Sequence, residues 1–160
     1  MSDRRIVVRT TDPAETRAAG RAIGRSLGGG FTLSLEGPLG AGKTVLAAGV
    51  CEGLGVEGPV TSPTFTLQNE YHGRGGRRVV HVDCFRLGGP GELEELGVLD
   101  RLEPDSVLLV EWGDRALEAL PPGAIRVELL PGVDSEREIA IHLPDGVRLA
   151  VFGDDTEDAG

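Results

Sequence analysis

One short stretch carries the clearest chemical signal in the sequence. Residues 37–44 read Gly-Pro-Leu-Gly-Ala-Gly-Lys-Thr and match the phosphate-binding loop pattern G-x-x-x-x-G-K-[ST]. In such a loop, successive backbone amides surround phosphate oxygens at a helix N-terminus. The lysine neutralises the β- and γ-phosphates, and the hydroxyl binds Mg²⁺. The sequence therefore predicts a nucleoside triphosphate site formed by Gly40, Ala41, Gly42, Lys43, Thr44 and Val45.

Two acidic residues, Asp83 and Glu111, each follow an apolar segment that reads as a strand. In open α/β sheets the ligand crevice lies outside the carboxyl ends of the strands. If both strands run parallel to the strand before the loop, both acids face the bound phosphates. Glu111 then suits the metal beside Thr44, whereas Asp83 would position or activate the attacking water, or share the magnesium. The alternative for each acid is a plain turn or a helix cap.

Lysine usage narrows the class of nucleotide enzyme. The chain has fifteen arginines and a single lysine, Lys43. A genomic bias against lysine codons would produce the same excess of arginine over lysine. The single lysine nevertheless stands in the loop, where a compact ammonium is needed rather than a planar guanidinium. A guanine-reading Asn/Thr-Lys-x-Asp motif needs a second lysine, so the sequence excludes a GTPase of that class.

Other polar residues give weaker signals. Residues 61–66, Thr-Ser-Pro-Thr-Phe-Thr, are rich in hydroxyl groups and stiffened by proline, so they predict either a nucleotide-sensing switch or a simple Ser-Pro turn. Two cysteines are too few for a disulfide framework, which favours a reducing compartment. Three histidines show no ligand spacing and are interpreted as turn or sheet residues: His72, His81 and His142.

A strand and a helix must position the loop. Phe31–Glu36 reads as a strand that leads directly into the glycines, and a helix is expected over about residues 43–54. This strand–loop–helix order is the context that a phosphate-binding loop requires. Upstream, Asp12 and Pro13 predict the start of another helix, which ends at a triple glycine.

The remaining segments complete an α/β pattern. The expected elements are a strand at Ile6–Arg9, a hairpin of Thr66–Tyr71 and Arg78–Asp83, a short helix after Pro90, a strand at Ser106–Glu111, a short helix near Arg115–Leu120, and strands at Ala124–Leu130, Glu138–His142 and Val147–Phe152. We therefore predict a single-domain P-loop NTPase fold over residues 1–152, with a mixed central sheet flanked by helices and antiparallel C-terminal strands. The acidic residues of 153–160 predict a disordered tail.

Charge and hydropathy limit the partners. The chain has 16 basic and 26 acidic residues, a net charge of −10, so its surface repels nucleic-acid backbones at long range. Its apolar runs are too short to span a membrane, and its charged start does not read as a signal peptide. A cytoplasmic protein is the simplest interpretation.

Four segments together resemble one family closely, the TsaE (YjeE) family of bacterial ATPases in tRNA threonylcarbamoyladenosine biosynthesis. The resemblance covers about residues 10–142, and the segments are Gly37–Thr44, Ser62-Pro-Thr-Phe-Thr, His81-Val-Asp-Cys-Phe-Arg-Leu and Leu109-Val-Glu-Trp-Gly-Asp. It implies an ATPase that needs Mg²⁺ and is slow by itself. It also implies partners of the TsaD and TsaB type, which add threonylcarbamoyl to adenosine 37 of tRNAs reading ANN codons. ATP hydrolysis would support multiple turnovers, and tRNA would be met only through the complex.

The resemblance also implies roles for particular residues. Thr44 and Glu111 would bind the metal, and Asp83 would be needed for hydrolysis together with Lys43. Residues 62–66, with Thr64 near the nucleotide, would form the first switch. Trp112 would be a signalling or partner residue. The adenine would lie near Thr11, Asp12 and Arg137. One departure is Cys84-Phe85, where the family commonly has Leu-Tyr.

Two alternatives remain open beside this hypothesis. A stand-alone small-molecule kinase of the P-loop class would transfer phosphate to a metabolite without a protein partner. A nucleotide-gated binding module would hold ATP as a switch, with turnover incidental.

Overall fold

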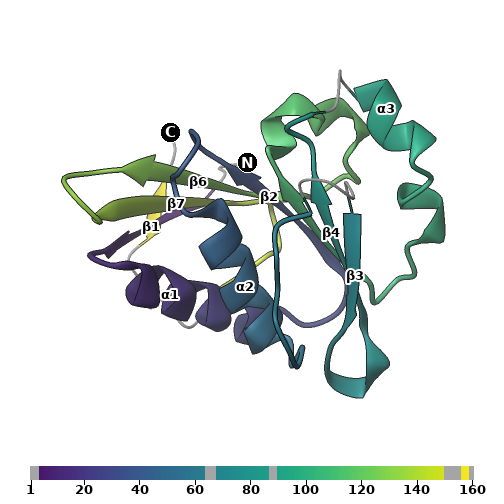
Figure 1. The fold of residues 1–160 in the computed structure, drawn as a ribbon, viewed down its shortest axis with the longest axis horizontal. Coiled ribbons are helices and arrows are strands. Elements are labelled where there is room, and N and C mark those ends of the chain that lie inside the picture. The colour runs from purple at the N-terminus through teal and green to yellow at the C-terminus, as the bar shows by residue number, and fades with distance from the viewer. Residues whose placement is uncertain (1–3, 64–67, 87–89, 150–155, 159–160) are drawn as a thin grey trace.

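A computed structural model of the chain describes residues 4–63, 68–86, 90–149 and 156–158. Its centre is one eight-stranded sheet in the order β3-β4-β5-β2-β6-β7-β1-β8 (Figure 1). The strands are β1 (Arg4–Thr10), β2 (Phe31–Glu36), β3 (Gln68–His72), β4 (Arg78–Asp83), β5 (Val107–Glu111), β6 (Ile125–Pro131), β7 (Arg137–Leu143) and β8 (Thr156–Asp158). The helices are α1 (Pro13–Ser26), α2 (Lys43–Gly53) and α3 (Pro90–Glu95).

The sheet is mixed, as expected. Its four central strands, β4, β5, β2 and β6, run parallel to one another. At one end of the sheet β3 pairs antiparallel with β4, and at the other β7, β1 and β8 pair antiparallel in turn. Since β4 and β5 run parallel to β2, the carboxyl ends of all three strands meet at the edge where the glycine loop begins.

Strand alternation divides the core between the two faces of the sheet. Leu109 of β5 belongs to the cluster that also holds Ile23 of α1 and Leu46 of α2. Leu108, one residue earlier, belongs to the opposite cluster with Leu93 of α3. Figure 1 shows α1 and α2 side by side, with α3 well away from them. Side chains in register with Leu109, two residues apart along each strand, therefore face α2.

The start of α1 confirms the expected capping. Asp12 is the N-cap, and its Oδ1 accepts the N–H of Glu15 at 2.8 Å. The Glu15 carboxylate in turn accepts the N–H of Thr11 at 2.8 Å. The side chains of Asp12 and Glu15 therefore accept hydrogen bonds from backbone N–H groups at the start of α1, where the helix offers no partner.

Glycines allow α1 and α2 to approach closely. Gly20 and Gly24 of α1 face Gly49 and Gly53 of α2, and a Cβ built on Gly24 would lie only 2.3 Å from the carbonyl oxygen of Val50. The backbones of the two helices therefore occupy the space that side chains would need. This contact fixes α2, and with it the loop at the N-terminus of α2, against α1.

We expect Gly24→Ala to lower the free energy of unfolding by about 2–3 kcal/mol, because the added methyl group overpacks this contact. Chemical denaturation followed by circular dichroism measures the change. Gly91→Ala is the matched control, since a Cβ on Gly91 of α3 meets no atom within 4 Å. Equal stability of the two variants would contradict the steric explanation.

A short helix expected near Arg115–Leu120 is instead two 3₁₀ turns, Gly113–Arg115 and Leu117–Ala119. The segment is too short to nucleate a stable helix by itself. The proline that follows also disfavours helical backbone in the residue before it, and Leu120 is extended, with φ −72° and ψ 148°.

Two C-terminal segments also differ from expectation. The expected strand at Val147–Phe152 is absent over residues 147–149, and its remainder lies outside the described residues. In the tail that was expected to be disordered, Thr156–Asp158 form β8 and pair with β1. Without β8, β1 would be an edge strand with unpaired backbone groups, and pairing with them orders residues 156–158. The composition of the tail does not reveal this pairing.

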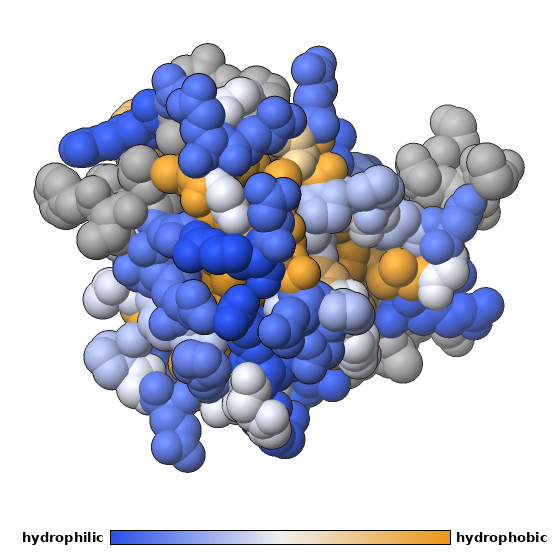
Figure 2. All heavy atoms as spheres, turned by 90° about the vertical axis from the view of Figure 1, so that its right-hand side faces the viewer, coloured by the Kyte–Doolittle hydropathy of each residue, from blue (hydrophilic) through white to orange (hydrophobic). Residues whose placement is uncertain are grey.

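Hydrophilic side chains cover most of the face that carries β3 and α3, with hydrophobic ones showing between them (Figure 2). Within the described part of the chain, no helix has the length and apolarity needed to cross a membrane.

Candidate functional site

The loop after β2 has the backbone that its glycines predict. Gly37 has φ 145°, and a Cβ there would lie 2.4 Å from the carbonyl oxygen of Leu129. Gly42, the N-cap of α2, has φ 101°, and no described side chain caps the first turn of this helix. Left-handed backbone of this kind favours glycine. The first-turn N–H groups of α2 therefore remain available to an anion.

A pocket of about 400 Å³ lies beside this loop. It is lined by residues 39–45 together with Ser62, Asp83, Phe85, Glu111 and Trp112. The structure thus brings both strand-terminal acids to the phosphate-binding loop, as the parallel strand order predicts. Thr64, expected near the nucleotide, lies outside the described residues.

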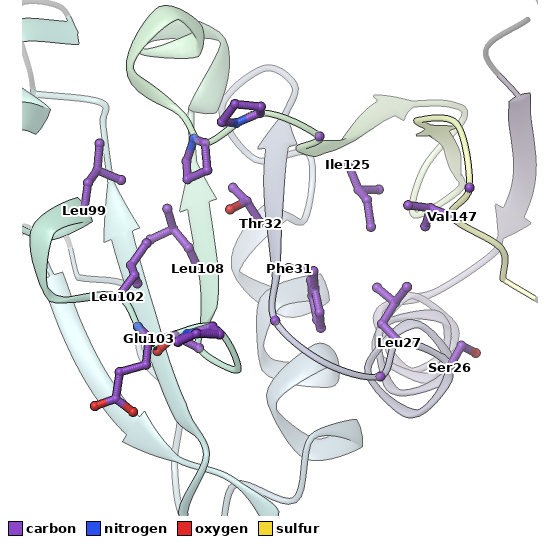
Figure 3. Close-up of a pocket in the computed structure, with 18 of the residues that line it drawn as sticks. Ser26, Leu27, Phe31, Thr32, Leu99, Leu102, Glu103, Leu108, Ile125 and Val147 are labelled. Carbon is purple, nitrogen blue, oxygen red and sulfur yellow. Dashed lines mark hydrogen bonds between the residues drawn. The ribbon is translucent and has the colours of Figure 1, made fainter. Parts of the chain in front are cut away.

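Another pocket, of about 550 Å³, lies at the opposite edge of the sheet. Phe31, Leu108 and Ile125, near the amino ends of their strands, are among the side chains around it (Figure 3). Glu103 and Arg148 also line this pocket, but the glycine loop and the two strand-terminal acids do not. The residues that the sequence singles out for chemistry therefore lie at the carboxyl ends of the strands.

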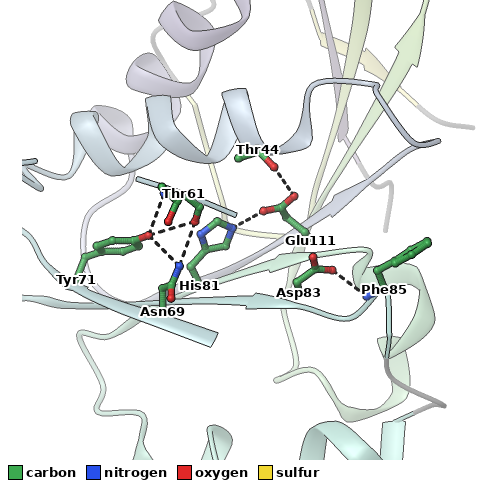
Figure 4. A network of polar contacts seen from close by, with 8 residues as sticks. All are labelled: Thr44, Thr61, Asn69, Tyr71, His81, Asp83, Phe85 and Glu111. Atoms are coloured by element: carbon green, nitrogen blue, oxygen red, sulfur yellow. Dashed lines mark hydrogen bonds and ion pairs between the residues drawn. The ribbon is translucent and has the colours of Figure 1, made fainter. Parts of the chain in front are cut away.

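Glu111 is held from two sides. The Thr44 hydroxyl donates to Glu111 Oε1 at 2.8 Å, and His81 Nε2 lies 2.6 Å from Glu111 Oε2 (Figure 4). Glu111 is 3% exposed, and a buried carboxylate needs such partners to offset its desolvation. Thr44 and Glu111, the two expected metal ligands, therefore lie in contact with each other, as two oxygen ligands of one hard cation would.

Asp83 stands opposite Glu111 in the register of β4 and β5. It is also buried, and its Oδ1 accepts the N–H of Phe85 at 2.9 Å (Figure 4). The turn-forming role that was the alternative for this acid is therefore real. It does not exclude a chemical role, because the carboxylate also lines the pocket beside the loop.

Lys43 lies folded over the loop. Its Nζ donates to the carbonyl oxygens of Gly37 and Pro38 at 2.7 and 2.8 Å, and lies 3.8 Å from the centroid of the Trp112 ring. Burial lowers the pKa of Lys43, while the charges of nearby acids, Glu111 first, act in the opposite direction. The ammonium is thus held at the loop by carbonyl dipoles and an aromatic face.

Trp112 has an unusual backbone for a bulky residue. Its φ of 60° lies in the left-handed region, and its N–H donates to the carbonyl oxygen of Leu35 at 2.9 Å. Its ring packs 5.0 Å from that of Phe85, and the Arg115 guanidinium lies over both rings. The strained turn directly after Glu111 therefore aims an aromatic cluster at the mouth of the site.

Arg137 reaches the loop from β7. Its Nε and Nη2 donate to the carbonyl oxygens of Ala41 and Gly40 at 3.0 and 3.2 Å. It also lines two small pockets, one that includes Gly40 and Gly42 of the loop and another that includes Thr11. The Asp12 side chain caps α1 and lines neither pocket. The structure therefore brings Arg137 to the loop and places Thr11 in a pocket with Arg137, while the Asp12 side chain caps α1.

The contact of His81 with Glu111 was missed from the sequence, where His81 is interpreted as an ordinary sheet residue. One signal could have found it. His81 precedes Asp83 by two residues in the same strand, so both side chains lie on the same face of the sheet. That face is turned toward α2 and the loop. Which residue His81 meets there, Glu111, follows only from the register in which β4 pairs with β5.

The segment before Pro63 is attached to the hairpin strand β3. Asn69 Nδ2 donates to the carbonyl oxygen of Thr61 at 3.1 Å, and the Tyr71 hydroxyl lies 3.3 Å from both the N and the O of Thr61 (Figure 4). Ser62, the next residue, lines the pocket beside the loop. The hairpin therefore fixes the point at which this hydroxyl-rich segment enters the site.

The two cysteines are both fully buried, and burial raises the pKa of Cys51 and of Cys84 to about 12. Because only the thiolate reacts, we expect neither thiol of the folded protein to react with a disulfide reagent at pH 8. Spectroscopic thiol counting with and without denaturant checks this, and the denatured chain should show both thiols. Rapid reaction of one thiol in the folded protein would contradict the burial that the structure gives it.

Comparisons with known proteins identify the family of the chain. The family model of TsaE, threonylcarbamoyl adenosine biosynthesis protein TsaE, matches residues 10–139. The chain is 45% identical over 115 residues to the tRNA threonylcarbamoyladenosine biosynthesis protein TsaE of Streptomyces coelicolor, covering 71% of this chain and 77% of that one. It is 35% identical over 127 residues to the protein of the same name from Treponema pallidum, covering 79% and 93%.

A solved structure gives the same result for the fold. The crystal structure of Bacillus subtilis YdiB superposes with a TM-score of 0.70 at 33% identity, covering 89% of this chain and 87% of that one. The mixed sheet with flanking helices agrees with the expected single-domain P-loop NTPase fold. With the family model matching most of its length, this chain belongs to the TsaE family.

Proposed function

We propose that this protein binds ATP with Mg²⁺ and hydrolyses it as a subunit of the machinery that adds threonylcarbamoyl to adenosine 37 of tRNAs reading ANN codons. Membership of the TsaE family supports the pathway. The observation that carries the chemical part is the 2.8 Å contact between the Thr44 hydroxyl and the Glu111 carboxylate at the end of the phosphate-binding loop.

The residues present suit a magnesium-bound triphosphate. Mg²⁺ takes one or two protein oxygens and shares the rest of its coordination with phosphates and water, so Thr44 and Glu111 are a sufficient protein contribution. Bound Mg²⁺ would neutralise charge that develops on the phosphates. The N–H groups of residues 40–45 and the Lys43 ammonium would hold the phosphates, and Asp83 would orient or activate the attacking water.

The base of the nucleotide has a proposed location next to the loop. A pocket of about 170 Å³ there is lined by Pro13, Thr16, Val45, Ser135 and Arg137, and it shares Gly40 and Gly42 with the phosphate pocket. Its hydrocarbon groups and its guanidinium face suit a flat aromatic base. We propose Arg137 and the neighbouring Thr11 and Asp12 as the adenine side of the site, with Thr64 on the phosphate side.

The charge of the chain favours partners over direct tRNA binding. A net charge of −10 opposes contact with a phosphate backbone, so tRNA would be met through basic partner proteins. We propose proteins of the TsaD and TsaB type as these partners, and the cytoplasm as the compartment. ATP turnover would be slow in the isolated chain and would support multiple turnovers of the assembled complex.

The ATPase rate of the purified chain, alone and then with the two partner proteins and tRNA, tests this proposal. A slow rate that rises on mixing would support it. A brisk rate that ignores the partners would contradict it and would favour the alternative of a stand-alone small-molecule kinase. Screening metabolites for phosphate acceptance would then be the next measurement.

A further inference from the structure

The His81 ring is buried with one polar contact. It has 0% exposure, and its Nε2 lies 2.6 Å from Glu111 Oε2. Among the described residues, its Nδ1 has no hydrogen-bond partner. Burying a polar ring costs free energy unless it is hydrogen-bonded, and leaving one nitrogen unpaired adds to that cost. A hydrocarbon side chain would suit the core better, so the contact with Glu111 is the one visible reason for a histidine here.

Glu111 is a residue that needs such a contact. Most phosphate-binding-loop proteins use the shorter aspartate beside the metal, and glutamate has one more rotatable bond, so its carboxylate has more positions to lose. In this structure each carboxylate oxygen has its own partner, Thr44 for Oε1 and His81 for Oε2 (Figure 4). An ionised carboxylate only accepts hydrogen bonds, so the bond requires the proton on Nε2 of His81.

Neighbouring elements hold the ring in place. His81 lies in the middle of β4, which pairs with β3 on one side and β5 on the other. The Tyr71 ring of β3 lies 6.5 Å from the His81 ring, between centroids. Tyr71 is itself attached to Thr61 through its hydroxyl. The donor is therefore fixed by two strands, while the acceptor Glu111 ends a third element, β5.

We propose that His81 is a positioning residue: it donates a hydrogen bond to Glu111 Oε2 and so fixes the carboxylate for the magnesium ion. This inference rests on the proposed function. Partners that orient a metal ligand from behind typically contribute about 10- to 100-fold to metal affinity. His81 would touch neither the metal nor the nucleotide, so its removal should change the magnesium requirement while leaving metal-free nucleotide binding intact.

Two variants of similar length separate hydrogen bonding from packing. His81→Gln keeps an N–H donor on a flexible chain, whereas His81→Met fills similar space without a donor. His72→Gln, an exposed substitution on β3, is the control. Binding of a non-hydrolysable ATP analogue can be followed through the chain's single tryptophan, Trp112, which lines the pocket. The measurement is made in EDTA and then as a function of Mg²⁺ concentration.

For His81→Met we expect the Mg²⁺ concentration at half-maximal binding to rise about tenfold or more, with the affinity in EDTA unchanged. His81→Gln should recover most of this loss, and His72→Gln should behave as the wild type. A merely structural role would instead lower the melting temperature and weaken binding equally with and without Mg²⁺. That result, or equal behaviour of the Gln and Met variants, would overturn the inference.

The failure of the proposed function gives a different result. Wild-type protein that binds the analogue equally in EDTA and Mg²⁺ would overturn the magnesium site itself, and the inference with it. Wild-type protein that responds to Mg²⁺ alongside a His81→Met variant with the same response would overturn the inference alone.

Discussion

Lys43→Ala is expected to weaken ATP binding by about 100-fold or more, the usual cost of removing one partner of a buried charged contact. Lys43 is the only lysine of the chain, so no other ammonium can take its place. Its Nζ already lies between the carbonyl oxygens of Gly37 and Pro38 at the loop. Isothermal titration calorimetry is the suitable measurement, because the contact of Lys43 with Trp112 would disturb a fluorescence signal.

Lys43→Arg is the matched variant for charge. It keeps the positive charge but replaces a compact ammonium with a wider, planar group, so we expect it to recover only part of the lost affinity. Both variants should retain wild-type secondary structure in circular dichroism. If Lys43→Ala bound ATP as tightly as the wild type, the glycine loop would be a structural turn and the proposed nucleotide site would be wrong.

The half of the candidate site that the glycine loop forms could be predicted because it is local in sequence. The loop pattern, the strand before it and the helix after it occupy one continuous segment, and the structure gives β2 and the start of α2 at the expected residues. Asp83 and Glu111 could be found because both end apolar strands. Their meeting required only that the strands run parallel, which is the usual arrangement in this class of fold.

The rest of the site depends on contacts between distant segments. Glu111 meets His81 because β4 and β5 pair in one particular register, which the sequence does not specify. Arg137 was expected near the adenine by resemblance, but its hydrogen bonds to the loop carbonyls of Gly40 and Ala41 follow only from the position of β7. The hydrophobic periodicity and the composition of the sequence describe each strand separately, so they could predict neither contact.

The fold shows the same division between local and distant causes. Helix α1 begins at Pro13 after the Asp12 cap, as its own residues predict. The glycine contact between α1 and α2 was not predicted, since glycine within a helix reads only as a weakness until its partner is known. The position of β1 between β7 and β8 was likewise unpredictable. In that register Arg4 and Arg5 stand opposite Asp158 and Glu157, which links the two ends of the chain.

Asp83→Asn is expected to lower the rate of ATP hydrolysis by about 100-fold or more while leaving ATP affinity within about threefold of the wild type. Asparagine keeps the oxygen that accepts the N–H of Phe85, so the turn after β4 should survive. It removes the negative charge and the ability to take a proton. Single-turnover hydrolysis with the partner proteins and tRNA, together with calorimetric ATP binding, separates the two effects.

Glu111→Gln provides the contrast that assigns the two acids. Because Glu111 pairs with Thr44 at the proposed metal position, its amide variant should raise the Mg²⁺ requirement, whereas Asp83→Asn should not. Similar magnesium requirements in both variants would contradict this division of roles. The Asp83→Asn protein also decides between an ATPase and a nucleotide-gated module. If the complex that contains it still modified tRNA through many turnovers at the wild-type rate, hydrolysis would be incidental, and bound ATP alone would be the active signal.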